Sequence, residues 1–429
     1  MSPSSQTQDR TYLPFRGVEN DDKAFLPLNP DLGEIRCVIL LPGSGDDPIQ
    51  CDLVYTNIDK ESDTRIPYLA LSYCWGDIED PVEILLHSPS LTGERTSAPF
   101  RVTRNLHIAL QAIRDETRQY LWIDALCIDQ QDPREKTHQV QLMGKIYSSA
   151  ESVLVWLGPD DEDSKFFSRA WTVHIQPMVN DHHPGEMLRL WERLRDNKNQ
   201  LWTYMARDEV LGQLGVNDRT GIRDNSSPDL CRKAISAGFC SLANRPWWSR
   251  IWVLQEVLLA PKQKGFGRNV EFRVGHTKLR WFDMLLPNSK KRYSLKTPSS
   301  SDDYNMITSF AWDTLLSKYG LYSYVKLEKL FWLTRNFQAS DPRDKLFALL
   351  PLASDTKDCF WKEPLITPNY SKSPKAVFDD LVRWNQCMMI GSLYVKGIGM
   401  IEMNGDSNWS KRECGFCRLR SCKNCSADM

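Results

Sequence analysis

Apolar positions along the chain alternate between short compact runs and longer stretches with helical spacing. Three compact runs predict buried strands: YLALSY at 68–73, YLWID at 120–124 and SVLVWLG at 152–158. Two stretches with apolar residues every three or four positions predict helices, from Arg104 to Arg114 and from Pro133 to near Ala150. Strands that alternate with helices in this way favour a parallel, doubly wound sheet.

Shorter signals flank this alternation. Residues 34–41 and 49–55 are β-type runs separated by a segment with Pro42 and two glycines, so they predict a hairpin ahead of the main pattern. Weaker patterns predict strands at 82–86 and 270–275, a helix at 247–259, two helices within 303–338, and a capped helix that starts at Asp341 and Pro342.

The helix that begins at Pro133 has a recognisable start. Asp132 stands at the N-cap position, proline occupies the first helical position, and Glu135 is placed to complete a capping box. Asp129 and Asp132 are therefore interpreted as turn and N-cap residues rather than as ligands.

These patterns divide the chain into four parts. We expect an N-terminal extension with a β-hairpin at 1–66 and an α/β domain at 67–262, whose charged, turn-rich segment 160–245 is a helical insertion. A mainly helical C-terminal region at 263–410, with a polar linker candidate at 288–303, and a cysteine-rich tail at 411–429 complete the division.

Composition narrows the class of protein. The chain has 429 residues, 41% of them apolar, and its 54 basic residues nearly balance its 55 acidic ones. Because no basic field is available to attract phosphates or anionic lipid, nucleic acid is not expected as a partner. The polar N-terminus lacks a secretory signal, and no run reaches the ~18 apolar residues of a membrane span. A soluble, cytoplasmic protein is expected.

Cysteine usage fits a reducing compartment. Eight of the twelve cysteines are scattered through a chain too large to need disulfides, so few or none are expected. The other four form two CxxC pairs in the tail, at Cys414, Cys417, Cys422 and Cys425. Such pairs can offer four thiolates to zinc, although the loop between them is shorter than zinc ribbons use. The alternatives are a tail without fixed structure or sequence from an incorrect gene model.

The predicted helix at 247–259 contains a carboxylate in an apolar stripe. On a helical projection, Glu256 has Trp252 and Val253 one turn before it and Leu259 and Ala260 one turn after it. Burial raises the pKa of a carboxyl group, which would make Glu256 a candidate general acid or base, or a stabiliser of a cationic intermediate. The alternative is purely structural, in that Glu256 pairs with a nearby arginine and ties the helix down; Arg250 and Arg245 are the candidates.

Polar groups also follow two of the predicted strands. In open parallel sheets, ligands bind beyond the carboxyl ends of the strands. The loop from Ser72 to Asp77 follows the first strand, and Asp124 closes the second. Asp124 has two readings, because an aspartate at a strand end can cap the next loop or bind a ligand hydroxyl.

Three blocks of sequence resemble one family. YLALSYCWGD at 68–77, LWIDALCIDQQDPREKTHQVQLMGKIYSSAESVLVWLG at 121–158 and RPWWSRIWVLQEVLLA at 245–260 resemble the signature blocks of the HET (heterokaryon incompatibility) domain of filamentous fungi. DPRDKLFALLPLA at 341–353 and TPNYSKS at 367–373 are similar to the region that trails this domain. The resemblance implies a role in non-self recognition after cell fusion and in programmed cell death.

A more distant resemblance, to TIR domains, bears on fold and chemistry. LSYCWGD resembles the first-strand box of TIR domains, WID their second-strand aspartate, and Trp252 with Glu256 their WxxxE helix. The resemblance implies a flavodoxin-like sheet and cleavage of NAD, as substrate and not cofactor, with Glu256 catalytic. The residues expected to line the nucleotide crevice are Ser72, Tyr73, Trp75, Gly76, Asp124 and Trp252. The long insertion, and Tyr73, Cys74 and Trp75 in place of the charged TIR residues, depart from that pattern.

Two other functions remain open at this stage. A non-enzymatic module would signal by recruiting other incompatibility proteins or by self-association through the HET domain. A degenerate family member would have no activity.

Overall fold

A computed structural model of the chain describes residues 25–59, 61–89, 95–114, 119–172, 237–238, 241–263, 267–280, 325–356 and 366–395. They fall in two compact units, Met1–Val377 and Phe378–Met429, and the helix α15 (Pro374–Val395) runs across the boundary between them. The fold described below belongs to the first unit.

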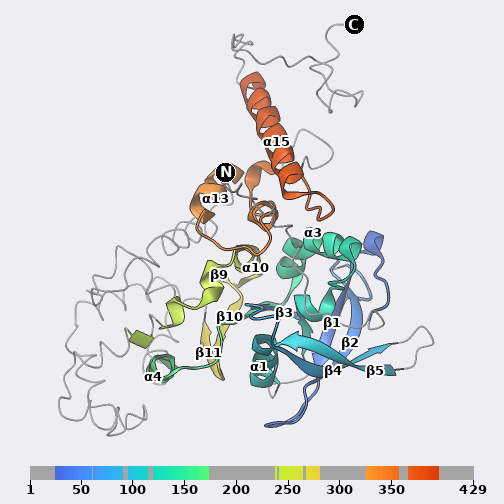
Figure 1. The fold of residues 1–429 in the computed structure, drawn as a ribbon, viewed down its shortest axis with the longest axis vertical. Helices are drawn as coiled ribbons and strands as arrows, with labels where there is room; N and C mark the ends of the chain where they lie inside the picture. The colour runs from blue at the N-terminus through green and yellow to red at the C-terminus, as the bar shows by residue number, and fades with distance from the viewer. Residues whose placement is uncertain are drawn as a thin grey trace, which may run out of the picture. The chain divides into compact units, whose positions relative to one another are not determined.

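The first unit is built on a nine-stranded sheet with the order β11-β10-β7-β3-β6-β1-β2-β4-β5 (Figure 1). The three compact apolar runs form β3 (Leu69–Tyr73), β6 (Tyr120–Trp122) and β7 (Ser152–Trp156), as predicted. The remaining strands are β1 (Glu34–Leu40), β2 (Gln50–Asn57), β4 (Pro81–Pro89), β5 (Arg95–Thr103), β10 (Val270–Val274) and β11 (Thr277–Arg280).

The sheet is mixed, which corrects the expectation of a mostly parallel one. The four strands β10, β7, β3 and β6 run parallel, as the alternation of strands and helices predicts. Outside this centre of the sheet, only β2 and β4 pair in parallel. The other pairs are antiparallel: β1 with β6, β1 with β2, β4 with β5, and β10 with β11. Hairpins at both flanks therefore extend a parallel centre, so an α/β class holds while the sheet as a whole is mixed and not mostly parallel.

The predicted N-terminal hairpin is present, and it belongs to the main sheet. β1 and β2 pair from Glu34 with Asn57 to Leu40 with Cys51, and β1 also pairs with β6 through Val38 and Leu121. The strand pairing thus continues across the expected boundary at residue 66. The predicted strand at 82–86 is longer than expected, and its partner β5 has no counterpart in the sequence prediction.

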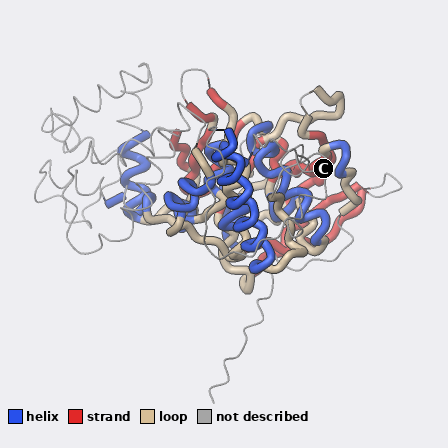
Figure 2. Tube along the Cα trace, turned by 90° about the horizontal axis from the view of Figure 1, so that it is seen from above, coloured by secondary structure: helices blue, strands red, loops and turns tan. Residues whose placement is uncertain are grey.

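Helices cover both faces of the sheet (Figure 2). On one face lies α1 (Arg104–Ile113), whose predicted apolar residues Leu106, Ala109, Leu110 and Ile113 are buried. On the other lies α3 (Pro133–Ser149), where the ring of Tyr147 meets that of Trp122 edge-on with centroids 5.5 Å apart. Asp132 caps α3 as expected, but Glu135 does not complete a capping box; it accepts hydrogen bonds from the fully buried Arg36 and from the backbone of Asp129.

The predicted helix at 247–259 is instead two short helices. A 3₁₀ helix, η5 (Pro246–Ser249), and α10 (Val253–Leu258) are separated by Arg250, whose extended backbone forms a β-bridge with Gln338. α10 packs against α3, and all six of its residues are buried.

Further along the chain, the helix expected from Asp341 begins at Asp344 instead, as α14 (Asp344–Phe347). The Asp341 carboxylate accepts from the backbone and side chain of Arg343 and does not cap that helix. The remaining short elements are α2 (Asp124–Cys127), α4 (Glu162–Ala170), α13 (Leu327–Thr334), β8 (Lys262–Gln263), β9 (Gly267–Arg268), η2 (Pro30–Leu32) and η7 (Ser354–Thr356).

Several sequence predictions lie outside the described residues. They are most of the insertion, the linker at 288–303, the first of the two helices within 303–338, and the cysteine-rich tail with Cys414, Cys417, Cys422 and Cys425. Within the described ranges, Cys37, Cys51, Cys74 and Cys127 are free thiols. None of the helices described here is both long enough and apolar enough to cross a membrane.

Candidate functional site

A pocket of about 610 Å³ lies at the carboxyl ends of the parallel strands. Its walls include the segments that directly follow β3 (74–76), β6 (Asp124) and β7 (157–159). This is the edge at which open parallel sheets bind ligands, and the volume is typical of small-molecule sites. The pocket lies at the strand ends where the sequence led us to expect ligand binding, although the sheet around it is mixed.

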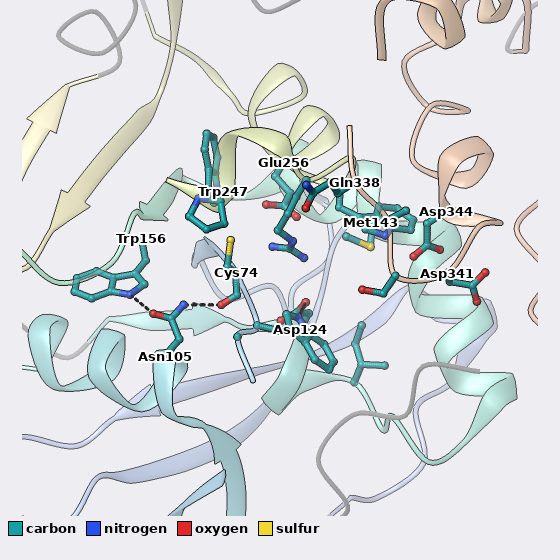
Figure 3. Close-up of a pocket in the computed structure, with 18 of the residues that line it drawn as sticks. Cys74, Asn105, Asp124, Met143, Trp156, Trp247, Glu256, Gln338, Asp341 and Asp344 are labelled. Atoms are coloured by element: carbon teal, nitrogen blue, oxygen red, sulfur yellow. Dashed lines mark hydrogen bonds between the residues drawn. The ribbon is translucent and has the colours of Figure 1, made fainter. Parts of the chain in front are cut away.

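Glu256 of α10 reaches this pocket from a helix whose six residues are all buried (Figure 3). Only 3% of the residue is exposed. Its Oε2 accepts a hydrogen bond from the hydroxyl of Ser72, which itself accepts one from the indole N–H of Trp247 at 2.8 Å. Strand β3 and helix η5 thus hold the carboxylate in one orientation through a chain of two hydrogen bonds.

Burial dominates the electrostatics of Glu256. Desolvation raises the pKa of this carboxyl to about 7, while the charge of Arg250 and the Ser72 hydroxyl oppose the rise. A group with this pKa exchanges its proton near neutral pH, which suits general acid–base chemistry.

The two arginines proposed as structural partners of Glu256 behave differently. Arg245 pairs with Asp161 on α4, at 2.7 Å, and so is not the partner. Arg250 acts on Glu256 through its charge, while its guanidinium donates a hydrogen bond to the carbonyl of Tyr73. Arg250 therefore ties the end of β3 to the start of α10 and leaves the Glu256 carboxylate hydrogen-bonded to Ser72.

Asp124 has the capping role that the sequence offered for it, and its ligand-binding role stays a prediction. Its carboxylate accepts from the Trp75 indole at 2.6 Å and from the backbone N–H of Ala125 at 2.8 Å, and it also borders the pocket. Burial raises the pKa of Asp124, and hydrogen bonds from Trp75 and Tyr73 together with the charge of Arg250 oppose the rise.

The loop after β3 is held from the opposite side. Asn105 of α1 donates to the carbonyl of Cys74 at 2.6 Å and accepts from the indole of Trp156 at 3.1 Å (Figure 3). Gly76 has φ +83°, and a Cβ built there would lie 3.2 Å from Asn105. Glycine at this position therefore allows both the turn and the close approach of α1.

The far wall of the pocket comes from the region after β11. Asp344 accepts from the hydroxyl of Tyr370 at 2.6 Å and from the side chain of Trp252, and burial raises the pKa of its carboxyl to about 6. Lys136 of α3 lies near this wall, and burial lowers the pKa of its ammonium group.

The pocket brings together most of the residues singled out in the sequence. Trp75, Gly76, Asp124, Trp252 and Glu256 all line it, whereas Ser72 and Tyr73 lie behind its surface, 1% and 2% exposed. Their roles in binding stay predictions; Ser72 and Tyr73 are placed to orient Glu256 and Asp124 and not to line the crevice. The sequence did not point to Lys136, Gln338, Asp344 and Tyr370 as lining residues.

Among the described residues, no cluster of three or more His, Cys, Asp or Glu side chains has the arrangement of a metal site. The four cysteines of the tail lie outside those residues, so their zinc option stays a prediction.

Comparisons with known proteins bear on the same region. Residues 68–256 match the family model described as heterokaryon incompatibility protein (HET). The chain is also 46% identical over 205 residues to heterokaryon incompatibility protein 6, OR allele, of Neurospora crassa, a match that covers 45% of this chain and 27% of that protein. The match thus spans about a quarter of the curated relative. No solved structure matches significantly.

Proposed function

We propose that this chain, whose residues 68–256 match the model of the heterokaryon incompatibility (HET) family, is a cell-death effector of fungal non-self recognition whose pocket cleaves NAD. The observation that carries the chemical part of this proposal is the position of Glu256. It is a buried carboxylate with its pKa near neutrality, and it borders a pocket at the carboxyl ends of parallel strands. The TIR-like order of the sequence blocks, with Trp252 and Glu256 in WxxxE spacing, supports the same reaction.

The reaction follows from the chemistry of that carboxylate. Nicotinamide leaves with the electron pair of its bond to C1′ of the ribose, and the ionised Glu256 stabilises the ribosyl cation that remains. A water molecule then adds to C1′ and gives up a proton, which Glu256 accepts and passes to solvent. The products are ADP-ribose, nicotinamide and a proton.

The surrounding residues have defined parts in this proposal. The Ser72 hydroxyl and the Trp247 indole orient the carboxylate, and Arg250 helps to keep it ionised in a buried site. Trp75, Gly76 and Asp124 form the adjoining wall, where they contact the nucleotide.

The test is NAD consumption by the purified chain and by Glu256→Gln. The substitution keeps the shape and removes the charge, so we expect nicotinamide release to fall by at least about 100-fold. The matched control is Glu162→Gln, which changes an exposed glutamate in the first turn of α4 and should cleave at the rate of the unmodified chain.

Expression in a fungal host separates the rival function. A module that signals by recruiting partners or by self-association would remain toxic when Glu256 is changed, with cellular NAD unaltered. Toxicity without NAD loss, or equal NAD loss from Glu256→Gln, contradicts the enzymatic proposal.

A further inference from the structure

The pocket extends beyond Glu256 to a second group of polar side chains. Lys136 from α3, Trp252, Asp344 from α14 and Tyr370 line its far end, and Figure 3 shows Asp344 well to one side of Glu256. Asp344 and Tyr370 lie outside the segment matched by the HET family model, which ends at residue 256. The far end thus combines two residues of the matched segment with two residues from the chain beyond it.

Asp344 is the acceptor at this end. The Tyr370 hydroxyl and the Trp252 side chain donate to it, and a carboxylate has about four lone-pair positions, so its capacity exceeds these two donors from the described part of the chain. A buried acceptor of this kind favours a ligand that donates hydrogen bonds.

Lys136 is the donor that accompanies it. The charges of Asp344, Asp341 and Asp124 all act on its ammonium group, so Lys136 lies within electrostatic reach of both ends of the pocket. The ring of Tyr370 lies 5.6 Å from its Nζ.

Charges at this end nearly cancel. Asp341 is held in an ion pair with Arg343 at 2.6 Å, which leaves Asp344 and Lys136 as a second pair of opposite charges. A phosphate group would add unbalanced negative charge to these paired charges, and an apolar group would bury the carboxylate and ammonium without new partners. A neutral group that both donates and accepts hydrogen bonds is complementary to this surface.

Adjacent hydroxyls are such a group, because each hydroxyl donates one hydrogen bond and accepts others. Carboxylates bind ribose hydroxyls in the same way at the strand ends of nucleotide-binding sheets. The rings of Trp252 and Tyr370 add flat surfaces beside the polar groups.

We propose that the far end of the pocket is a subsite for the vicinal diol of a ribose, with Asp344 accepting from its hydroxyls and Lys136 donating to them. This inference rests on the proposed function: if the nicotinamide ribose lies beside Glu256, the diol held at Asp344 is that of the adenosine ribose. Asp344 is then a specificity residue supplied by the chain beyond the matched domain.

Calorimetry with ADP-ribose, which needs no turnover, tests the subsite. We expect the full chain to bind ADP-ribose about 10- to 100-fold more tightly than the analogue whose adenosine ribose lacks its 2′ and 3′ hydroxyls. The Asp344→Asn variant should bind ADP-ribose about 10-fold more weakly than the unmodified chain does, and it should discriminate less between the two ligands. Asp163→Asn, which changes an exposed aspartate of α4, is the matched control and should bind both as the unmodified chain does.

Tyr370→Phe provides a second variant that keeps the Asp344 carboxylate. This substitution should weaken the binding of ADP-ribose by only about 3- to 5-fold, because Trp252 still orients the carboxylate. Near-ultraviolet circular dichroism checks that both variants fold. Equal affinity for the two ligands in the unmodified chain, unaltered discrimination in a folded Asp344→Asn, or no binding of ADP-ribose at all would overturn the subsite.

The outcome is separable from that of the cleavage proposal. Diol-dependent binding without nicotinamide release supports the subsite and contradicts the role of Glu256. If nicotinamide release depends on Glu256 but the binding of ADP-ribose does not depend on the diol, the cleavage proposal is supported and the subsite is contradicted.

Discussion

Glu256 carries an electrostatic cost that the rest of α10 does not. The residue is 3% exposed, and its carboxyl has a pKa of about 7 in the folded chain, against an ordinary value of 4.5. Because the folded state holds this proton more tightly than the unfolded state, ionising Glu256 works against folding. The free energy of unfolding therefore depends on whether Glu256 is ionised, whatever reaction the pocket performs.

This dependence of stability on pH gives a prediction for Glu256→Gln. The folded chain binds more protons than the unfolded chain between pH 4.5 and about 7, so the stability contributed by protonated Glu256 is complete below pH 4.5 and is lost as pH rises through 7. The neutral variant avoids this loss, and we expect it to be more stable than the unmodified chain at pH 8 by up to about 3 kcal/mol. Urea unfolding at pH 5 and pH 8 measures the difference.

The control for this measurement is Glu162→Gln on the surface of α4. Its stability relative to the unmodified chain should be nearly independent of pH, because the side chain of Glu162 stays exposed to solvent when the chain folds. A Glu256→Gln variant that is less stable at pH 8 than at pH 5, relative to the unmodified chain, would show that the carboxylate is ionised and well paired.

The sequence allowed Glu256 to be chosen but not its hydrogen-bond partners. A glutamate between apolar neighbours one turn away is visible in a helical projection, and its burial follows. Ser72 lies 184 positions away in the sequence and Trp247 reaches Ser72 from another element, so neither contact has a local signal. Tyr73 was expected to line the crevice, but it lies behind the pocket surface, where its hydroxyl hydrogen-bonds Asp124.

At the scale of elements, helix α10 connects the segment matched by the HET family model to the part of the chain that follows it. Gln255, fully buried, donates from Nε2 to the carbonyls of Phe347 and Ala348, at 3.2 and 3.0 Å. These bonds join α10 to the end of α14, which begins with Asp344. The same short helix thus presents Glu256 to the pocket and anchors the element that supplies its far wall.

We predict that Gln255→Leu destabilises the chain by about 1–3 kcal/mol, because two buried carbonyls each lose a donor. Urea unfolding measures the effect. The matched control is Gln141→Leu, in which an exposed Nε2 loses one bond to the carbonyl of Pro368 and whose cost should stay below about 0.5 kcal/mol. Equal costs for the two variants would mean that Gln255 does not join α10 to α14.

Element boundaries were predictable where the pattern is local. β3, β6, β7, α1 and α3 coincide with the predicted runs to within a few residues. β5 was missed because its sequence, RTSAPFRVT, contains a proline and mostly polar residues, as suits a strand at the sheet edge. The break between η5 and α10 also has no local cause in the sequence, since the N–H of Ile251 bonds to Gln338, a partner 87 residues away.

At the scale of the molecule, the sheet is larger than the segment matched by the family model. β1 and β2 precede residue 68, and β10 and β11 follow residue 256, yet all four lie in the same nine-stranded sheet. Within the matched segment the parallel strands are β7, β3 and β6; β1 pairs with β6 on one side of them, and β10 pairs with β7 on the other. Ile35, Cys37, Val38 and Phe272 on these flanking strands are fully buried.

This arrangement predicts how a fragment of residues 67–262 behaves. Without β1 and β10 it exposes the free edges of β6 and β7, and it lacks Phe272, which stacks on Trp248 with ring centroids 5.5 Å apart. Unpaired edges and exposed apolar surface favour association and loose packing. We therefore expect the fragment to aggregate or to unfold without a cooperative transition. The amides of β6 and β7 should exchange rapidly with deuterium in the fragment, whereas the full chain protects them.

The fragment 25–262 is the internal comparison, because it restores β1 beside β6 but leaves β7 without β10. It should regain protection in β6 and leave β7 unprotected. A 67–262 fragment that unfolds cooperatively, with both strands protected, would place the domain boundary where the sequence pattern drew it.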